Sequence, residues 1–361
     1  MKKFKIAIIG ISGYSGLALA NILINHSAFE IKGLFSSNYA GKSLSQVHGL
    51  FTGYLNADFP LIENLDNLIE NLVKKEIDCV FTATPNGVSS GLAEDLLQNN
   101  IKLIDLAADF RLQNPETFNE WYAPLKSVKS EILKQAVYGL TEWNRDKIKS
   151  AKIIANPGCY PTATALAIIP LLQNNLIDNS VFIIDAKSGT TGAGRKAEQS
   201  LLFSEVQESF SAYKPLLHRH IPEIEQTLIN FGSQGHLPDI KIRFTPHLLP
   251  IKRGILNTIY LKPNPNISKN KINSLLQETL SEAYKTEFFV NIVPEPPKTK
   301  DVYGTNKCHI FATYDERTDL IVLISVIDNL IKGAAGQAIQ NANLLFDLPE
   351  SMGLNSLGLL P

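Results

Sequence analysis

Cys159 carries the clearest chemical signal in the sequence. It lies in the segment 156–162 (Asn-Pro-Gly-Cys-Tyr-Pro-Thr), directly ahead of an apolar stretch with helical spacing. Pro161 suits the first turn of a helix, because that position leaves its N–H unpaired. Cys159 is then expected at the positive end of the helix dipole, which stabilises a thiolate and lowers the pKa of the thiol. Gly158 is expected to bend the backbone sharply and keep the sulfur accessible, so the segment predicts a catalytic nucleophile.

A thiol that forms an acyl intermediate needs an acid/base partner. Of the seven histidines, two stand close together in the polar segment 218–224, just before a predicted helix. Histidine changes charge near neutral pH, so His218 or His220 can accept the thiol proton and later protonate a hemithioacetal oxygen. The residue types leave both open as the acid/base, and a purely structural role for the pair is the alternative.

A glycine-rich turn at residues 10–16 predicts a dinucleotide site. The turn has the spacing G-x-x-G-x-x-G and lies between a predicted strand (4–9) and a predicted helix (17–23). Glycine allows a tight turn there and lets backbone N–H groups approach a pyrophosphate at the helix N-terminus. The residues expected to contact the cofactor are Gly10, Ser12, Gly13, Tyr14, Ser15 and Gly16.

The end of the second predicted strand favours NADP over NAD. An acidic residue at this point would bind the ribose 2′-hydroxyl of NAD. The sequence has Ser36 and Ser37 instead, with Lys42 shortly after and no acid between them. Two hydroxyls and a cation suit a 2′-phosphate, which a carboxylate would repel. A thiolate beside a nicotinamide then predicts that hydride reduces a thioester on Cys159 to an aldehyde.

Further residues are candidates for holding anionic groups. A second glycine-rich loop, 188–195, follows a predicted strand, and its backbone donors (Ser188, Gly189 and Gly192) could hold the cofactor or a substrate phosphate. Arg111 and Arg253 are candidate substrate clamps, since guanidinium binds carboxylate or phosphate in a bidentate manner.

Composition limits the class of protein. At 361 residues the chain exceeds the usual size of one core, so two domains are expected. A net charge of -1 gives no electrostatic reason to expect nucleic acid or an anionic membrane as partner. Three scattered cysteines form neither a disulfide framework nor a zinc site, and Cys79 and Cys308 are expected in the core. No stretch approaches the ~18 apolar residues of a membrane helix, so we expect a soluble, cytoplasmic protein.

The order of predicted elements indicates an α/β architecture in the first part of the chain. Strands (4–9, 29–35, 77–83, 102–106) alternate with helices (17–23, 64–75, 88–97), which predicts a parallel sheet covered by helices on both faces. From about residue 153 the pattern changes to an α+β mixture with a largely antiparallel sheet. Its predicted helices are 162–172, 272–284 and 330–345, and its predicted strands are 181–186, 240–245, 255–261, 307–313 and 320–327.

These segments together resemble the N-acetyl-gamma-glutamyl-phosphate reductase family, the arginine-biosynthesis relatives of aspartate-semialdehyde dehydrogenase. The resemblance covers nearly the whole chain and is strongest at residues 155–162. It rests on segments 10–16, 105–111, 138–142, 155–162, 188–195, 218–224 and 328–337. It implies a Rossmann NADP-binding domain (1–154), an α+β catalytic and oligomerisation domain (155–328), and a C-terminal helix region (329–361) that returns to the Rossmann domain.

The resemblance also implies roles for single residues. Cys159 is the thioacylated nucleophile, the 218–224 segment supplies the base with His218 favoured over His220, Asn156 contacts substrate, and Asn329 lies near the nicotinamide. The implied reaction reduces N-acetyl-L-glutamyl 5-phosphate with NADPH to the 5-semialdehyde and phosphate, in a homotetramer or homodimer. The alternatives are the same chemistry on an aminoadipyl phosphate one methylene longer, in lysine biosynthesis, or a non-catalytic NADP-binding sensor.

Overall fold

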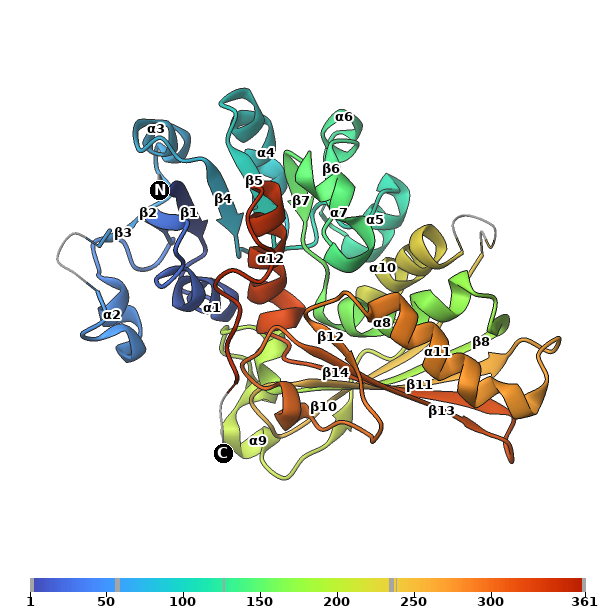
Figure 1. Ribbon diagram of the computed structural model, residues 1–361. Coiled ribbons are helices and arrows are strands. Elements are labelled where there is room, and N and C mark those ends of the chain that lie inside the picture. Colours follow the sequence, from blue (N-terminus) through green and yellow to red (C-terminus); the bar gives the residue numbers. More distant parts are fainter. Residues whose placement is uncertain (1–2, 56–58, 126, 234–236, 238, 359–361) are drawn as a thin grey trace. The chain divides into compact units, whose positions relative to one another are not determined.

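The chain folds into two compact units (Figure 1). The structure is a computed structural model that describes residues 3–55, 59–125, 127–233, 237 and 239–358. The first unit comprises residues 1–157 and 334–355, and the second comprises residues 158–333 and 356–361. The chain therefore passes from the first unit to the second immediately ahead of Gly158 and Cys159.

The first unit contains a parallel sheet, as predicted. Within the described residues the strand order is β3-β2-β1-β4-β5-β7-β6, and every neighbouring pair is parallel. This order places the carboxyl ends of β1 and β4 side by side, where open α/β sheets bind ligands. The strands are β1 (Phe4–Ile9), β2 (Phe29–Phe35), β3 (Ile62–Glu63), β4 (Cys79–Thr82), β5 (Lys102–Asp105), β6 (Ala136–Tyr138) and β7 (Ile153–Ala155).

Apolar residues of these strands are buried on both faces of the sheet. Alternate positions such as Ile9, Val80 and Leu103 pack against Leu72 and Leu96 of the α3 and α4 helices. The helices of this part of the chain are α1 (Tyr14–Leu23), α2 (Leu44–Val47), α3 (Leu68–Lys74), α4 (Val88–Gln98), α5 (Pro115–Tyr122), α6 (Ser130–Leu133) and α7 (Thr141–Lys149), with a 3₁₀ turn at Gly49–Phe51.

The α3 helix begins later than predicted. Its apolar spacing predicted a start at residue 64, but Asn67 has a left-handed backbone with φ +51. Just ahead of it, the side-chain amide of Asn64 donates to the Asp66 carboxylate, and the backbone N–H of Asp66 donates to the Asn64 side chain at 3.2 Å. Such local bonds of Asn and Asp compete with helix formation, so the apolar period extends beyond the helix itself.

A helix from the end of the chain completes the first unit. This helix, α12 (Gly336–Leu345), packs against α7, β5 and α1. One helix over residues 330–345 was predicted. The structure instead has a π-helical turn, Ile331–Ala335, followed by α12.

The second unit contains a mixed sheet with the order β12-β13-β14-β11-β8-β10-β9 among the described residues. Most pairs are antiparallel, as predicted, while β8 pairs parallel with β10 and β12 pairs parallel with β13. The strands are β8 (Ile177–Ser188), β9 (Ser211–Ala212), β10 (Arg243–Leu248), β11 (Ile255–Pro263), β12 (Val290–Ile292), β13 (Cys308–Asp315) and β14 (Leu320–Ile327).

The α8 helix (Cys159–Gln173) lies at the centre of the second unit. Every residue from Tyr160 to Leu172 is buried, and the helix packs against β11, β14, α10 (His220–Thr227) and α11 (Ile272–Tyr284). Cys159, the first residue of α8, is thus partly exposed at the end of a buried helix. The remaining helical segments of this unit are α9 (Phe203–Val206), the 3₁₀ turns Thr190–Ala193, Gln199–Leu201, Lys269–Lys271 and Thr299–Val302, and the π-helical Leu228–Gly232. In the part of the chain that the structure describes, no helix combines the length and apolarity needed to cross a membrane.

Candidate active site

The glycine turn at 10–16 connects β1 to the N-terminus of α1, as predicted. Two of its glycines are required by the fold. Gly10 has φ +86, and a Cβ there would lie 2.3 Å from the carbonyl oxygen of Ala83. A Cβ at Gly16 would lie 2.4 Å from the carbonyl oxygen of Gly10. Both contacts are with backbone atoms, which cannot move aside without distorting the sheet edge.

Gly13 differs, because nothing in the protein explains it. Its φ of -77 and ψ of 163 suit any residue, and the nearest atom to a Cβ there is 3.5 Å away. Gly13 is the N-cap of α1 and has no side chain to cap the first amide groups of the helix. An open N-terminus at a glycine without packing constraints is the arrangement through which a backbone approaches a pyrophosphate.

Two serines predicted to select the cofactor lie at the same edge. Ser36 follows β2 and is buried, and its hydroxyl oxygen lies 3.1 Å from that of Ser12 in the glycine turn. Ser37 is exposed beside it. The backbone N–H of Ser36 donates to the carbonyl of Glu63 at 3.0 Å. The sequence did not predict that this acidic residue lies beside Ser36. The Glu63 carboxylate forms an ion pair with Lys75 at 3.0 Å, which offsets its charge.

Thr84 was not predicted as a site residue. It follows β4, and its Cγ2 atom lies 3.3 Å from the position of a Cβ at Gly10. Its hydroxyl is buried and has no hydrogen-bond partner within the protein. A buried hydroxyl without a partner costs free energy, so this group beside the glycine turn suits contact with a bound ligand. Only the pairing of β4 with β1 brings it here, and the sequence spacing carries no such signal.

Cys159 is the first residue of α8, with partial exposure, whereas Cys79 and Cys308 are buried as predicted. Pro161 lies in the first turn, also as predicted. The role predicted for Gly158 is wrong in one respect. Its φ of -67 and ψ of 154 are extended backbone that any residue adopts, so it makes no bend that requires glycine.

Contacts within the second unit hold the start of α8. The N–H of Gly158 donates to the carboxylate of Glu223 at 2.8 Å, and Glu223 is fully buried in the first turn of α10. A Cβ at Gly333 would lie 2.6 Å from the Cβ of Cys159. Neither Glu223 nor Gly333 was predicted as a site residue. Glu223 follows His220 by three residues, which places both on one face of a helix, and that spacing was the available signal.

His218 and His220 lie together near the start of α10. Their ring centroids are 4.8 Å apart, and both rings contact Tyr160 at 5.6 and 5.9 Å. The backbone N–H of His220 donates to Nδ1 of His218 at 3.1 Å. Burial lowers the pKa of His218 to about 2, with a smaller contribution from His220. The bond to Nδ1 and the lowered pKa both favour a neutral His218 ring with its proton on Nε2.

The phenol groups of Tyr160 and Tyr213 lie 3.2 Å apart beside these rings. Burial raises the pKa of Tyr160 above its usual range and that of Tyr213 to about 12, and a charge on Cys159 raises both further. Both phenols are thus neutral donors near the thiol. Neither phenol was predicted as a site residue.

The second glycine-rich loop does not offer the free backbone donors that were predicted. The N–H groups of Gly189, Thr190 and Thr191 donate to carbonyls of residues 251–254, and that of Gly192 donates to Gly189. Asn329 holds the same two segments together, because it accepts from the Gly254 N–H at 2.8 Å and donates to the Thr191 hydroxyl at 3.0 Å.

Among the other residues of this region, the hydroxyl of Ser188 donates to the adjacent Gly189 carbonyl at 3.0 Å. Arg253 stays partly exposed, 3.6 Å from the buried carboxylate of Asp328. It thus keeps part of its guanidinium open to an anion.

Arg111 and Asn156 are buried in the first unit and form hydrogen bonds inside it. Arg111 donates from Nε to the carbonyl of Asn156 and from a terminal nitrogen to the carbonyl of Leu106, each at 2.8 Å. Asn156 is 1% exposed. A direct contact of either residue with substrate would replace these bonds.

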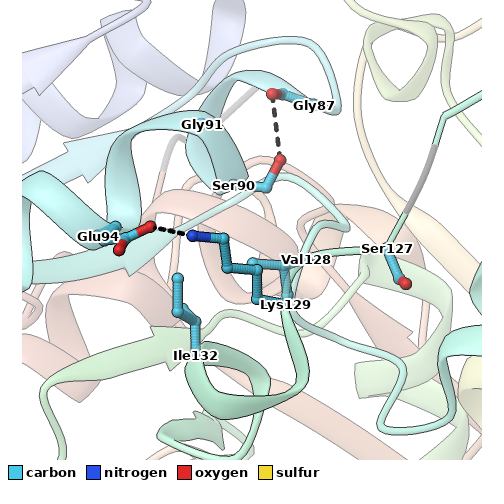
Figure 2. A pocket seen from close by; sticks show the side chains of 8 residues that line it. All are labelled: Gly87, Ser90, Gly91, Glu94, Ser127, Val128, Lys129 and Ile132. Carbon is cyan, nitrogen blue, oxygen red and sulfur yellow. Dashed lines mark hydrogen bonds and ion pairs between the residues drawn. The ribbon is translucent and has the colours of Figure 1, made fainter.

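A surface hollow of about 360 Å³ lies elsewhere, between α4 and α6 (Figure 2). In it Lys129 forms an ion pair with Glu94 at 2.7 Å, and the Ser90 hydroxyl donates to the Gly87 carbonyl. The predicted site residues do not line it. Its lining residues are Gly87, Ser90, Gly91, Glu94, Ser127, Val128, Lys129 and Ile132.

The fold and the two sites define a semialdehyde dehydrogenase. Residues 5–151 match the family model described as "Semialdehyde dehydrogenase, NAD binding domain", and residues 159–329 match "Semialdehyde dehydrogenase, dimerisation domain". Solved structures of aspartate semialdehyde dehydrogenases share the fold. The Vibrio cholerae enzyme II has a TM-score of 0.69 at 16% identity over 96% of this chain and 99% of that one. The Candida albicans enzyme with NADP has a TM-score of 0.66 at 14% identity over 96% and 99%.

The chain belongs to the N-acetyl-gamma-glutamyl-phosphate reductase family. It is 43% identical to the enzyme of that name from Clostridium botulinum, over 97% of this chain and 98% of the relative. It is 44% identical to the one from Pelotomaculum thermopropionicum, over 99% of both chains.

Proposed function

We propose that this protein reduces N-acetyl-L-glutamyl 5-phosphate to N-acetyl-L-glutamate 5-semialdehyde and phosphate, with NADPH as reductant, in arginine biosynthesis. The observation that carries the proposal is Cys159 as the partly exposed first residue of the buried α8 helix. Family membership at over 40% identity across nearly the whole chain supports the substrate class. We also propose a cytoplasmic location, because a free thiol nucleophile requires a reducing compartment.

The residues of the glycine turn fit NADPH. Gly13 leaves the first turn of α1 open to a pyrophosphate, the unpartnered hydroxyl of Thr84 lies beside the turn, and Ser36 and Ser37 suit a 2′-phosphate. When bound, NADPH supplies a hydride to the thioester carbon. The protein holds the dinucleotide through backbone N–H groups and hydroxyls rather than through a carboxylate.

Cys159 carries the acyl group. Its thiolate attacks the acyl carbon, phosphate leaves, and a thioester remains on the sulfur. After hydride addition the oxygen takes a proton from the acid/base group. The hemithioacetal then returns this proton to the same group as its C–S bond breaks, which releases aldehyde and thiolate. The N-terminus of α8 favours the thiolate at the start and at the end of this sequence.

We assign the proton transfers to His220 rather than His218. The Nδ1 atom of His218 already accepts the backbone N–H of His220, and burial keeps the ring neutral with its proton on Nε2. His218 then orients its neighbour through this bond. The buried Glu223 holds the Gly158 N–H and lies one turn from His220 on α10, so it fixes the start of α8 against the helix that carries the base.

We further propose a homodimer or homotetramer assembled through the second unit. The family model that matches this unit is described as a dimerisation domain. The mass in solution, measured by light scattering at catalytic concentrations, tests the assembly, and a monomeric mass would contradict it.

The reverse reaction tests the proposed function most directly. Purified protein with NADP, phosphate and N-acetyl-glutamate semialdehyde should form NADPH, followed by its absorbance, and only when phosphate is present. Cys159→Ser should lower the rate by at least about 10³-fold, because it removes the group that forms the thioester. Cys308→Ser is the matched control, since Cys308 is buried with its sulfur 3.5 Å from the Ser325 hydroxyl, a hydrogen-bond partner for the new serine.

Two results would contradict the proposal. Phosphate-independent NADPH formation would exclude an acyl phosphate as the substrate. Turnover of aminoadipate semialdehyde, without turnover of N-acetyl-glutamate semialdehyde, would assign the protein to lysine biosynthesis, where the substrate is one methylene longer.

A further inference from the structure

Asn156 fixes the backbone that leads to the nucleophile. Its N–H donates to the carbonyl of Asp105 at 2.8 Å, and its carbonyl accepts from Nε of Arg111 at 2.8 Å. Its side chain donates to the carbonyl of Ala334 at 3.1 Å and accepts from Asn341 at 3.2 Å. Each of its polar atoms is thus bonded within the first unit, to segments that are far apart in sequence.

The α12 helix that supplies Asn341 is unusually polar for a buried helix. Four amide side chains in its ten residues are fully buried, namely Gln337, Gln340, Asn341 and Asn343. Burying an amide costs free energy unless it is hydrogen-bonded. The partners of these amides are therefore informative.

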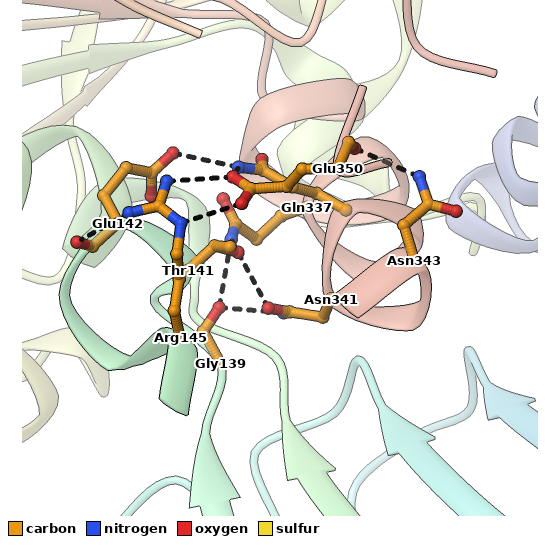
Figure 3. A network of polar contacts seen from close by, with 9 residues as sticks. Gly139, Thr141, Glu142, Arg145, Gln337, Asn341, Asn343 and Glu350 are labelled. Carbon is orange, nitrogen blue, oxygen red and sulfur yellow. Dashed lines mark hydrogen bonds and ion pairs between the residues drawn. The ribbon is translucent and has the colours of Figure 1, made fainter. Parts of the chain in front are cut away.

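The contacts of Asn341 form a directed chain toward Asn156. Figure 3 shows its first part, from Gln337 through Thr141 to Asn341. Gln337 donates to the hydroxyl of Thr141, and this hydroxyl donates to Oδ1 of Asn341 at 2.7 Å. Nδ2 of Asn341 donates to the carbonyl of Gly139 at 2.8 Å and to Oδ1 of Asn156. Since the Thr141 hydroxyl supplies the donor, the amide of Asn341 has one orientation, with its nitrogen toward Asn156.

Close packing maintains this orientation. A Cβ at Gly139 would lie 2.4 Å from Nδ2 of Asn341, so the strand end and the amide are in direct contact. Only Pro157 and Gly158 separate Asn156 from Cys159. Proline fixes its own φ, and the Gly158 N–H is bonded to Glu223. A displacement of Asn156 is therefore passed along a short, constrained segment.

We propose that Asn341 is a positioning residue for the reaction: through Asn156 it fixes the backbone that places the Cys159 sulfur for attack. This inference rests on the proposed function in taking Cys159 as the nucleophile. It assigns Asn156 and Arg111 to holding the loop rather than to contact with substrate.

Asn343 offers a matched control on the same helix. It is as buried as Asn341, and its amide donates to two carbonyls, those of Glu350 at 3.0 Å and Met352 at 2.9 Å. Both partners lie in the C-terminal segment and not in the nucleophile loop. Alanine at either position removes two hydrogen bonds donated to oxygens, and in each case one of the two oxygens keeps a second donor, Gln337 at the Gly139 carbonyl and His26 at the Met352 carbonyl. The two variants should therefore lose similar stability.

The test compares Asn341→Ala with Asn343→Ala in the full chain. Asn341→Ala should lower kcat by about 10- to 100-fold with KM within about threefold, because a misplacement of about 1 Å costs on that order. It should also slow alkylation of Cys159 by iodoacetamide at pH 7 by about threefold, read from the modified peptide by mass spectrometry. Asn343→Ala should lower Tm by a similar amount and leave both rates unchanged.

Thr141 provides a second pair of variants, in case Asn341→Ala does not fold. Thr141→Val removes the hydroxyl that orients Asn341 and should reproduce its loss of kcat, whereas Thr141→Ser keeps the hydroxyl and should restore it. Equal loss of rate in Asn341→Ala and Asn343→Ala, in proportion to their Tm, would overturn the proposal. So would wild-type rates in Thr141→Val. The alkylation rates need no substrate, so they decide the matter even if the proposed substrate is wrong.

Discussion

Replacing Gly13 by alanine should separate cofactor binding from folding at the glycine turn. The new Cβ has 3.5 Å to its nearest protein atom, and the backbone angles suit alanine. The methyl group would enter only the space through which we expect the pyrophosphate to approach. Alanine at a helix N-cap is modestly worse than glycine, so Tm should fall by no more than about 3 °C.

The expected loss of affinity follows from crowding. Forcing an extra methyl group into a filled contact costs about 1–3 kcal/mol. Gly13→Ala should therefore raise the Kd for NADPH by about 5- to 150-fold, because each 1.4 kcal/mol is tenfold. The fluorescence of NADPH on titration with protein measures this change directly.

Gly16→Ala supplies the contrast. Its Cβ would lie 2.4 Å from the Gly10 carbonyl oxygen and 2.8 Å from the Ile11 Cα, which are backbone atoms. A cost near 3 kcal/mol predicts a fall in Tm of about 6–12 °C. If Gly13→Ala kept wild-type affinity, the cofactor would not contact this turn and the reasoning from its open N-cap would be wrong. A Gly13→Ala variant as unstable as Gly16→Ala would refute the geometry itself.

Two buried titratable groups lead to predictions about pH. Burial raises the pKa of Asp105 to about 6 from an ordinary value of 3.8, so its contribution to stability is complete below pH 4 and is lost as the pH rises through 6. Asp105→Asn should flatten the free energy of unfolding between pH 4.5 and 7 by roughly 2 kcal/mol in urea titrations, and parallel curves for variant and wild type would contradict this. Burial lowers the pKa of His218 to about 2, so its stabilising effect is complete above pH 6.5 and falls as the pH decreases. The ring resonances of His218 should accordingly stay at their neutral positions from pH 8 to 5 in NMR of the folded protein, and titration within that range would refute its assignment as a neutral donor.

Local sequence patterns were enough to predict most elements. The helix 272–284 and the strand 320–327 begin and end where their apolar spacing predicted. The glycine turn and the cysteine at a helix start are also local, since neighbouring residues determine both. Such features need no information about partners far along the chain.

The polar interior could not be predicted in the same way. Segment 330–345 looked like a helix rich in small residues, yet Asn341 and Gln337 are buried because their partners at Gly139 and Thr141 lie about 200 positions earlier. Thr84 and Glu63 reach the cofactor edge only through strand pairing, which spacing does not reveal. The parallel pairing of β8 with β10 inside a mostly antiparallel sheet has the same origin.

The discontinuity of the first unit has a consequence for its synthesis on the ribosome. When residue 157 has been made, every strand of this sheet has been translated but α12 has not, and the Gly139 carbonyl and the Thr141 hydroxyl lack their later partners. At ~5–20 residues per second, translation of residues 158–355 takes on the order of 10–40 s. Throughout that delay the surface of the nascent first unit that α12 will later cover, on α7, β5 and α1, stays uncovered. This is the stage at which chaperones can bind it. The segment that completes the unit is made only after residues 158–333 have been translated.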